Sequence, residues 1–336
     1  MKGLKNIALI VLVTLAYTGY GQQYTAKAYE FYQAQQFDSA KVWLDSAVVS
    51  NERFNSQTWQ LRGLVYRKLE SPENSTYRDI SIESFVQARN VDSTDKYKEK
   101  IDGYLYNTII RYYNDAVTSM NEGDLDGSEL AYSAYKNKYK KYIDAGFDFK
   151  TNDIEYYNAL GGNYLKMVAE LTGEEKAKMV AKGVHYYEIV LEYDPNQFMP
   201  NFNVGIMYYN QGADLIMNMD PLTPIEDVPA IEARAQEGFQ KALPYLQHAN
   251  KLDPSRTDVI EAITGCYYGL WGSENEDYIK YQTMLDERNL PGLLEKISAD
   301  PENKTVLKEL IRIYSTTLKD EAQYKKYSEI LNKLED

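Results

Sequence analysis

Few residues of this chain have the types and spacing that catalysis or metal binding requires. The two histidines, His185 and His248, lie far apart in the sequence, and the single cysteine, Cys266, has no second thiol to pair with. The segment Glu122–Gly127 alternates acids before a glycine, as a calcium loop does, but Ser133 stands where the last, bidentate acid of such a loop belongs. We therefore interpret this segment as a polar turn between helices.

Longer catalytic patterns are also missing from the sequence. It has no GxxxxGK phosphate loop, no GxSxG nucleophile elbow and no HExxH zinc helix. A pair of carboxylates for glycoside hydrolysis stays open among the 50 acids, because such a pair is defined in space, but nothing singles out two of them. We expect a protein that is not an enzyme, with no catalytic residues, no metal site and no cofactor.

The charge balance narrows the class of partner. The chain has 37 basic and 50 acidic residues, which gives a formal net charge of −13. A surface of that sign repels phosphate backbones, so we expect no nucleic-acid partner. The 32 tyrosines supply rings for a core and hydroxyls for water or a partner.

The N-terminus has the pattern of a secretory signal. Two lysines precede an apolar run over Ile7–Ala16, and small residues at positions 19 and 21 follow it. The pattern predicts a signal peptide over residues 1–21 with cleavage before Gln22. The alternative is an uncleaved anchor, but a run of about ten residues is too short for a membrane span, which needs about twenty. No cysteine lies near the cleavage site, so we expect an exported chain without a lipid anchor or a direct membrane span.

One short pattern recurs along the chain and predicts its elements. A small residue is followed three positions later by an aromatic one in Gly63/Tyr66, Gly161/Tyr164, Gly205/Tyr208 and Gly265/Tyr268, and more loosely in Ala28/Phe31. Triplets with spacing i, i+4 and i+7 trail it: Ala40/Leu44/Ala47, Ser81/Phe85/Ala88, Ser128/Tyr132/Tyr135, Gly183/Tyr187/Val190 and Ala242/Leu246/Ala249. Each triplet shares one helix face, and small residues opposite large ones let two antiparallel helices pack closely. Pro195 and Pro254 follow two of the triplets and should end those helices.

This pairing of helices resembles the tetratricopeptide repeat (TPR). The resemblance covers about five repeats from Gln22 to Asn289 and a degenerate pair up to Asp336. It implies an all-α fold, a right-handed superhelical solenoid of antiparallel helix pairs with about five to six repeats, as one TPR-like helical repeat domain over residues 22–336. Successive small residues of the first helices are 35 to 60 positions apart, against about 34 in the family, so several repeats should have elongated helices or insertions.

Three places depart from the family pattern. The longest expected insertion is Asn218–Ala230, with three prolines and three acids, which either projects as a binding element or is a bare spacer. In the third repeat Ser119 stands where an aromatic residue is expected, and in the sixth Asp277 stands where a small residue belongs.

The family also implies where partners would bind. Its first helices line a concave groove, and the residues three before, one after and four after the small residue face it. Applied here, this gives as partner-binding candidates Tyr29, Tyr32, Gln60, Arg67, Tyr113, Asn158, Phe202 and Tyr209. Such a groove suits an extended peptide or a helix docked through aromatic anchors. The alternative for each residue is ordinary packing between repeats.

The signal and the resemblance together imply a function. We expect a non-catalytic protein–protein interaction scaffold or adaptor in the bacterial periplasm, at the outer membrane or secreted, with envelope or outer-membrane proteins as partners. The alternative is a glycan or small-ligand binding protein of an outer-membrane uptake system, similar to the SusD-like proteins, which contain related repeats and stack sugars on aromatic rings. A sugar site would be a compact ring of two or three exposed tyrosines away from the groove.

Overall fold

The computed structural model describes residues 23–168 and 171–335, which are helical apart from their turns and loops. No strand occurs in these two ranges, so the predicted all-α fold is confirmed. The predicted signal peptide over residues 1–21 lies outside the described residues. Among the helices of the described ranges, none has both the length and the apolarity that crossing a membrane requires.

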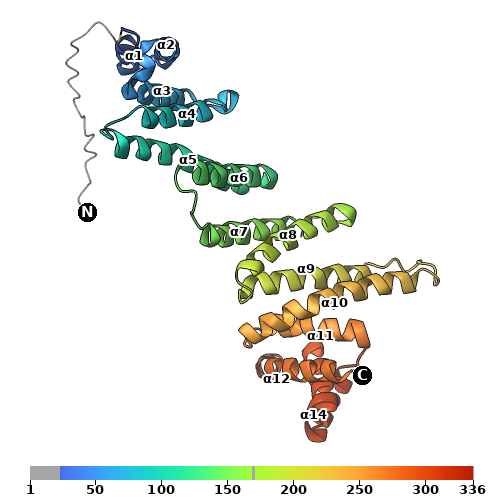
Figure 1. The fold of residues 1–336 in the computed structure, drawn as a ribbon. Helices are drawn as coiled ribbons and strands as arrows, with labels where there is room; N and C mark the ends of the chain where they lie inside the picture. Colours follow the sequence, from blue (N-terminus) through green and yellow to red (C-terminus); the bar gives the residue numbers. More distant parts are fainter. Residues whose placement is uncertain (1–22, 169–170, 336) are drawn as a thin grey trace, which may run out of the picture. The chain divides into compact units, whose positions relative to one another are not determined.

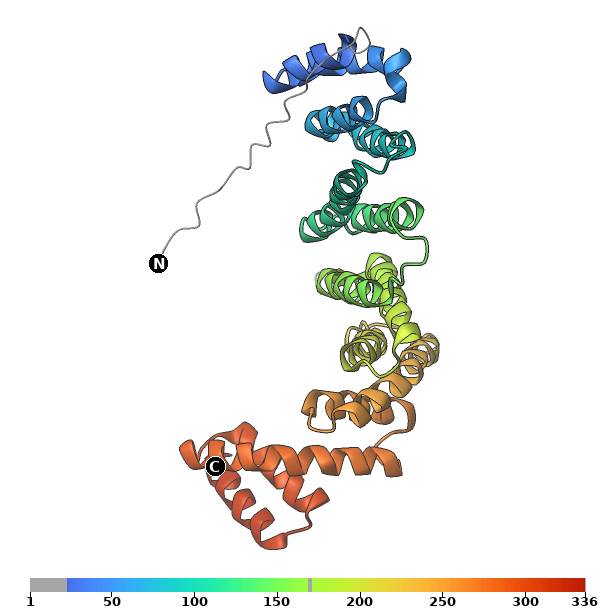
Figure 2. The same cartoon turned by 60° about the vertical axis from the view of Figure 1, so that its left-hand side comes forward.

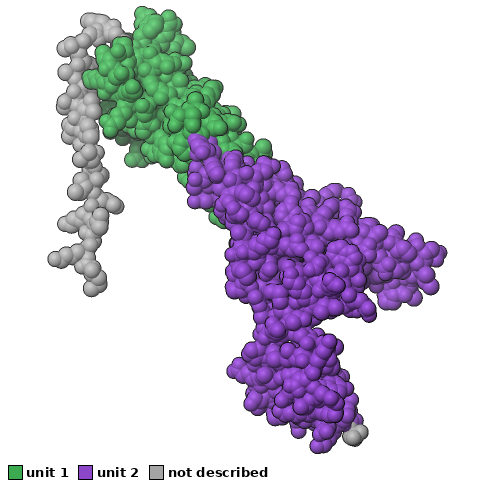
Figure 3. All heavy atoms as spheres, turned by 60° about the horizontal axis from the view of Figure 1, so that its bottom comes forward, with its two compact units in different colours: residues 1–147 green, residues 148–336 purple. Residues whose placement is uncertain are grey.

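The chain divides into two compact units between Phe147 and Asp148 (Figure 3). Unit 1 contains α1 (Gln23–Gln33) paired with α2 (Phe37–Ala47), α3 (Ser56–Leu69) paired with α4 (Tyr77–Asn90), and α5 (Lys98–Asn121) paired with α6 (Leu125–Tyr142), with two 3-10 turns, η1 (Asn51–Phe54) and η2 (Pro72–Asn74). In unit 2, α7 (Lys150–Val168) pairs with α8 (Gly173–Tyr193), α9 (Phe198–Met217) with α10 (Val228–Leu252), α11 (Thr257–Trp271) with α12 (Glu276–Ala299), and α13 (Lys304–Arg312) with α14 (Glu321–Glu335), with a π-helical turn η3 (Ile313–Thr317) after α13.

Within each unit, consecutive helices lie side by side as the sequence pattern predicts (Figures 1 and 2). The small residues of the pattern lie where paired helices touch. A Cβ atom added to Gly63 of α3 would lie 2.5 Å from the Phe85 ring of α4, and one added to Gly205 of α9 would lie 2.6 Å from Leu246 of α10. Real Cβ contacts are not that short, so glycine is what lets these helices approach. The predicted helix pairing is confirmed.

Serines in two of the triplets add a polar tie that the sequence pattern did not predict. Ser81 Oγ of α4 donates to the carbonyl oxygen of Gly63 at 2.8 Å, and Ser128 Oγ of α6 donates to the carbonyl oxygen of Ala116 at 2.7 Å. A buried hydroxyl needs such a partner, and the helix carbonyl accepts the additional bond. The third pair, which has the weakest pattern, is therefore built like the second.

The extra length of the repeats lies mostly in the helices themselves. The helices α1 to α4 have 11 or 14 residues, whereas α5 to α10 have 18 to 25. The insertion expected over Asn218–Ala230 is a shorter loop over residues 218–227, because α10 already begins at Val228. Pro229 lies in the first turn of α10, where its missing N–H is not needed.

One buried carboxylate fastens the last helix pair to the one before it. Asp286 of α12 is 2% exposed and accepts hydrogen bonds from the guanidinium of Arg312 at 2.5 and 3.1 Å, from Thr317 Oγ1 at 2.5 Å and from Gln282 Nε2 at 2.7 Å. Hydrogen bonds to Glu309 and to Asp286 raise the pKa of Arg312 above its usual range. A buried charge with this many donors is satisfied, so α13 and η3 dock on α12 without leaving an unpaired charge.

Candidate functional site

Three successive first helices of unit 1 bring aromatic and basic side chains together. Tyr29 and Tyr32 of α1 are half-buried at the edge of the first core cluster. The guanidinium carbon of Arg67, on α3, lies 5.7 Å from the ring centre of Tyr104, on α5. Lys100 Nζ lies 5.7 Å from the same ring centre. These five residues are called the tyrosine–arginine site below.

The electrostatics of Tyr32 connect α1 to the other two helices. Burial raises the pKa of its hydroxyl, the neighbouring Tyr104 raises it further, and Arg67 lowers it, with a net upward shift. The hydroxyl is therefore protonated at neutral pH and can donate a hydrogen bond. The site offers rings, a hydroxyl donor and two cations, within a chain whose net charge is negative. This combination suits a peptide segment with an acidic side chain beside an apolar one.

Sequence reasoning found three of these five residues and missed Lys100 and Tyr104. Both lie on the first turns of α5, which begins at Lys98, well before the small residue Ala116 that anchors the pattern. A rule that counts from the small residue of a standard repeat cannot reach these extra turns. The buried Ile101 and Leu105, four positions apart, are the signal that could have shown that the helix extends this far.

The other candidates of unit 1 pack inside the fold. Gln60 is 6% exposed, and its Nε2 donates to Ser56 Oγ at 3.1 Å. This is a correction, because the amide serves the core rather than a groove. Tyr113 is half-buried within its own pair, with ring centres 6.2 Å from Tyr132 and 5.5 Å from Tyr135.

The candidates of unit 2 do not form a second site like that of unit 1. Asn158 is half-buried on α7. Phe202 stacks on Phe198 at 5.8 Å, and the guanidinium carbon of Arg256 lies 5.2 Å from its ring centre. Tyr209 packs between helix pairs, because a Cβ added to Gly265 of α11 would lie 2.5 Å from its hydroxyl oxygen.

The cysteine that follows Gly265 is also part of the core. Cys266 is fully buried, and burial raises the pKa of its thiol to about 12. A thiol in this state is protonated at neutral pH and therefore a poor nucleophile. The described ranges contain no group of three or more His, Cys, Asp and Glu residues that could hold a metal ion. Asp124, in the segment that resembles a calcium loop, instead caps α6 by accepting from the Gly127 N–H at 2.9 Å.

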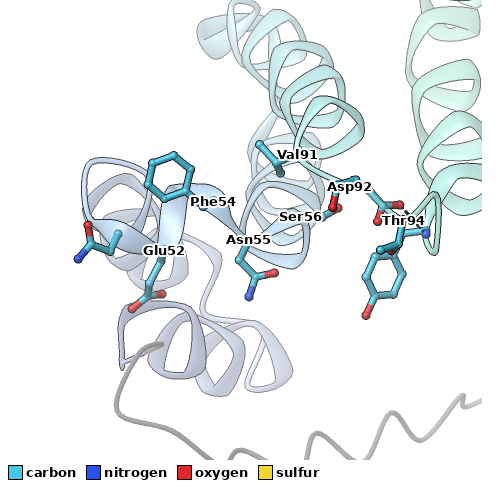
Figure 4. A pocket seen from close by; sticks show the side chains of 10 residues that line it. Glu52, Phe54, Asn55, Ser56, Val91, Asp92 and Thr94 are labelled. Carbon is cyan, nitrogen blue, oxygen red and sulfur yellow. Dashed lines mark hydrogen bonds between the residues drawn. The ribbon is translucent and has the colours of Figure 1, made fainter.

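A hollow of about 410 Å³ lies between η1, the start of α3 and the loop after α4 (Figure 4). Its two buried carboxylates already have structural roles. Glu52 accepts from the backbone N–H groups of Tyr24 at 2.9 Å and Thr25 at 2.8 Å, so it caps the start of α1. Asp92 accepts from the Tyr97 N–H at 2.6 Å, just before α5. The hollow therefore holds helix ends in place, and it offers no free charge for a ligand.

Two exposed rings and a half-buried one lie near the turn between α11 and α12. Tyr268 is 58% exposed and Trp271 is 54% exposed, one helical turn apart on α11. The ring of Tyr278, on α12, lies 5.6 Å from that of Tyr268. Gly272, with a φ of +77°, makes the turn that places the two helices side by side. We call Tyr268, Trp271 and Tyr278 the aromatic platform.

Comparisons with known proteins identify no family for this chain. No family model matches it, and no curated protein does. Among solved structures, it is similar to a monomeric mutant of IFIT1 with Gppp-AAAA, with 10% identity and a TM-score of 0.27 over 93% of this chain and 71% of that one. It is also similar to the TPR domain of P58(IPK), with 11% identity and a TM-score of 0.24 over 94% of this chain and 98% of that one. Scores this low add no argument of their own, so the TPR-like pairing rests on the packing described above.

Proposed function

We propose that the chain is a non-catalytic scaffold that binds partner proteins through the tyrosine–arginine site. The observation that supports this most is the convergence of Tyr32, Arg67 and Tyr104 from three successive first helices. Each residue comes from a different helix pair, so the site exists only when the pairs stack. Tyrosine and arginine are also the residue types that most often dominate binding energy at protein interfaces.

The partner that fits this site is an extended peptide or a helix. An acidic side chain of the partner would accept from Arg67 and from the Tyr32 hydroxyl, while an apolar neighbour covers the Tyr29 ring. We propose that the chain is exported and that its partners are envelope or outer-membrane proteins. The N-terminal sequence supports the export proposal, and cell fractionation tests it: recovery of the full-length chain from the cytosol, without processing at residue 22, would overturn it.

The binding proposal is tested by affinity capture from detergent-solubilised envelope. The mature chain is compared with Arg67→Ala and Tyr32→Ala variants, and with Arg53→Ala as a matched control, because Arg53 is an exposed arginine of unit 1 outside the site. For proteins captured by the unchanged chain, each site variant should weaken binding by about 30-fold, the effect of losing one hot-spot side chain. Equal binding by all four proteins would move the partner site elsewhere.

A second candidate function is glycan binding at the aromatic platform. Tyr268 and Trp271 are exposed one helical turn apart, and the ring of Tyr278 lies beside that of Tyr268. These rings lie outside the tyrosine–arginine site, as a separate sugar site requires. Sugar rings present apolar C–H faces that pack on aromatic faces. Titration with soluble oligosaccharides, followed by tryptophan emission in the unchanged chain and in a Trp271→Phe variant, tests it. An emission change that persists in Trp271→Phe, or no change at all, would exclude the platform.

A further inference from the structure

The helices α9 and α10 extend together as an arm (Figure 1). They touch at backbone distance, because a Cβ added to Gly212 would lie 2.6 Å from the carbonyl oxygen of Ala235, and one added to Gly238 would lie 2.9 Å from the carbonyl oxygen of Tyr208. Backbone atoms cannot move aside as a flexible side chain can. The two helices are therefore held firmly together to within two turns of their outer ends, and the loop over residues 218–227 forms the tip of the arm.

Hydrogen bonds hold the tip in a defined conformation. The Leu222 N–H donates to Asp220 Oδ1 at 2.8 Å, and the Thr223 N–H donates to the carbonyl oxygen of Asp220 at 2.8 Å. The Asp227 N–H donates to the carbonyl oxygen of Pro224 at 2.9 Å. Two consecutive turns of this kind fix the direction of the side chains between them.

This ordered loop presents large apolar side chains to solvent. Leu222 and Ile225 are each 87% exposed, and Met217, at the end of α9, is 81% exposed. Single exposed apolar residues are common on protein surfaces, whereas contiguous apolar patches mark binding surfaces, and three large apolar side chains lie within nine positions here. Asp220, Glu226 and Asp227 lie among them, so the apolar surface has an acidic border.

The surrounding sequence strengthens this negative border. No lysine or arginine occurs between Lys182 and Arg234, so the segment that contains the arm has only acidic charges. Asp214, in the last turn of α9, pairs with Lys176 of α8, so Asp220, Glu226 and Asp227 supply the charge of the tip. Whatever covers Leu222 and Ile225 must therefore tolerate carboxylates at its edge.

We propose that the tip of this arm docks into an apolar pocket, bordered by lysine and arginine, on a partner protein. Leu222 and Ile225 enter the pocket, and the carboxylates of Asp220, Glu226 and Asp227 pair with the basic border. A bilayer fits less well, because anionic headgroups repel these acids and burial of carboxylates in the interface is unfavourable. This surface shares no residue with the tyrosine–arginine site, so either proposal can fail alone.

Site-specific crosslinking in cells that make the protein tests this proposal. A photoreactive phenylalanine derivative replaces Leu222 in one full-length chain and Leu130 in a matched control. Leu130 is also highly exposed, at 74%, but lies on α6 of unit 1. Position 222 should give one discrete protein adduct that position 130 does not give, and the crosslinked partner peptide should contain lysine or arginine. An adduct with lipid, an adduct with a second copy of this chain or no specific adduct would each overturn the proposal.

The purified partner then separates the apolar contact from the charged one. Leu222→Ser should raise the dissociation rate by about tenfold or more at any salt concentration. The triple variant Asp220→Asn/Glu226→Gln/Asp227→Asn should mainly slow association at low salt and match the unchanged chain at high salt, since border charges act through steering. Equal rates for the triple variant and the unchanged chain at low salt would refute a basic border. Both variants lie at an exposed tip, and unchanged thermal unfolding confirms that they fold.

Discussion

The two units join their successive helix pairs by different chemistry. We call the contact between two successive helix pairs a joint. In unit 1 the joints are networks of charged and hydroxyl groups. Glu70, at the end of α3, pairs with Arg78 of α4 and, at 2.8 Å, with Arg111 of α5, and Arg78 also pairs with Asp115 of α5 at 2.5 Å. In unit 2, from α8 to α11, the joints are mainly glycines that receive large side chains. A Cβ on Gly183 would lie 2.5 Å from the Met207 side chain of the next pair.

The two units also differ in net charge. Residues 23–147 have 16 basic and 18 acidic residues, a net charge of −2, whereas residues 148–336 have 19 basic and 32 acidic residues, a net charge of −13. One repeat framework thus accepts two solutions for the contact between pairs. Directional ion pairs are used through unit 1 and again where Arg312 meets Asp286 of α12. Close packing on glycines dominates from α8 to α11, with Lys176–Asp214 as an added ion pair.

The largest predicted effect breaks a joint of unit 1. Glu70 is 6% exposed, so Arg78→Ala leaves a buried carboxylate without its main partner. We expect a loss of about 3–5 kcal/mol in the free energy of unfolding, measured by urea denaturation. The double variant Glu70→Gln/Arg78→Met removes both charges and should recover more than half of that loss. A single variant that loses less than about 1 kcal/mol would show that the joint carries little of the stability.

The next effect breaks the close packing of glycine inside one helix pair of unit 2, α9 with α10. In Gly212→Ala the new Cβ would meet the Ala235 carbonyl oxygen at 2.6 Å, so the helices must separate. We expect a loss of about 1–3 kcal/mol in the free energy of unfolding. Gly103→Ala in α5 is the matched control, because nothing lies within 4 Å of its Cβ position. That variant should gain about 0.5–1 kcal/mol from helix propensity alone, and variants of equal stability would contradict the packing argument.

A smaller effect concerns how the stability of unit 1 changes at low pH, through the half-exposed side chain of Asp79. Burial raises the pKa of Asp79, but hydrogen bonds from Lys138 and from the Tyr112 hydroxyl outweigh it, and the net shift is downward. A lowered folded-state pKa gives stability that is present above the unfolded-state pKa of about 4 and is lost as pH falls through the folded value. Asp79→Asn should therefore lose about 0.5–1 kcal/mol at pH 7 and match the unchanged chain near pH 2. A difference independent of pH would exclude the ionised carboxylate as the cause.

The smallest predicted effect has opposite signs in the two units. Added salt screens the attractive pairs of unit 1 and the repulsion among the excess acids of unit 2. Hydrogen exchange at about 0.5 M salt should show slightly weaker protection in residues 23–147 and slightly stronger protection in residues 148–335, each by about 0.5 kcal/mol. Shifts of the same sign in both units would show that charge acts on the two units in the same way.

The sequence predicted the helix pairs well because each contact depends on the residue types of two helices that follow one another along the chain. A glycine at position 63 and a phenylalanine at position 85 define a contact that only two paired helices can satisfy. The candidate site was predicted only in part, since Tyr104 depends on where α5 begins and not on the repeat pattern. The same limit explains Gln60, because a position rule says which way a residue faces but not whether the next helix covers it.

The exposed ring of Tyr268 also shows that the repeat pattern does not determine burial. Tyr66 and Tyr164 occupy the same position of the recurring pattern and are buried, whereas Tyr268 is 58% exposed. The pattern describes the residues of one pair, and burial also depends on the neighbouring pairs. The charge asymmetry between the units could have been counted from the sequence, but the boundary after Phe147 was needed to see it.

The cap on α1 has a consequence for the order in which the chain can fold during synthesis. The carboxylate of Glu52 that holds the first backbone N–H groups of α1 lies 27 residues after Thr25. A chain that emerges N-terminus first therefore exposes all of α1 and α2 before that carboxylate appears, and a helix of 11 residues without a cap is marginal in water. The helices α1 and α2 therefore become stable only after Glu52 has emerged. A chain that passes through a channel N-terminus first then has little folded structure at its leading end.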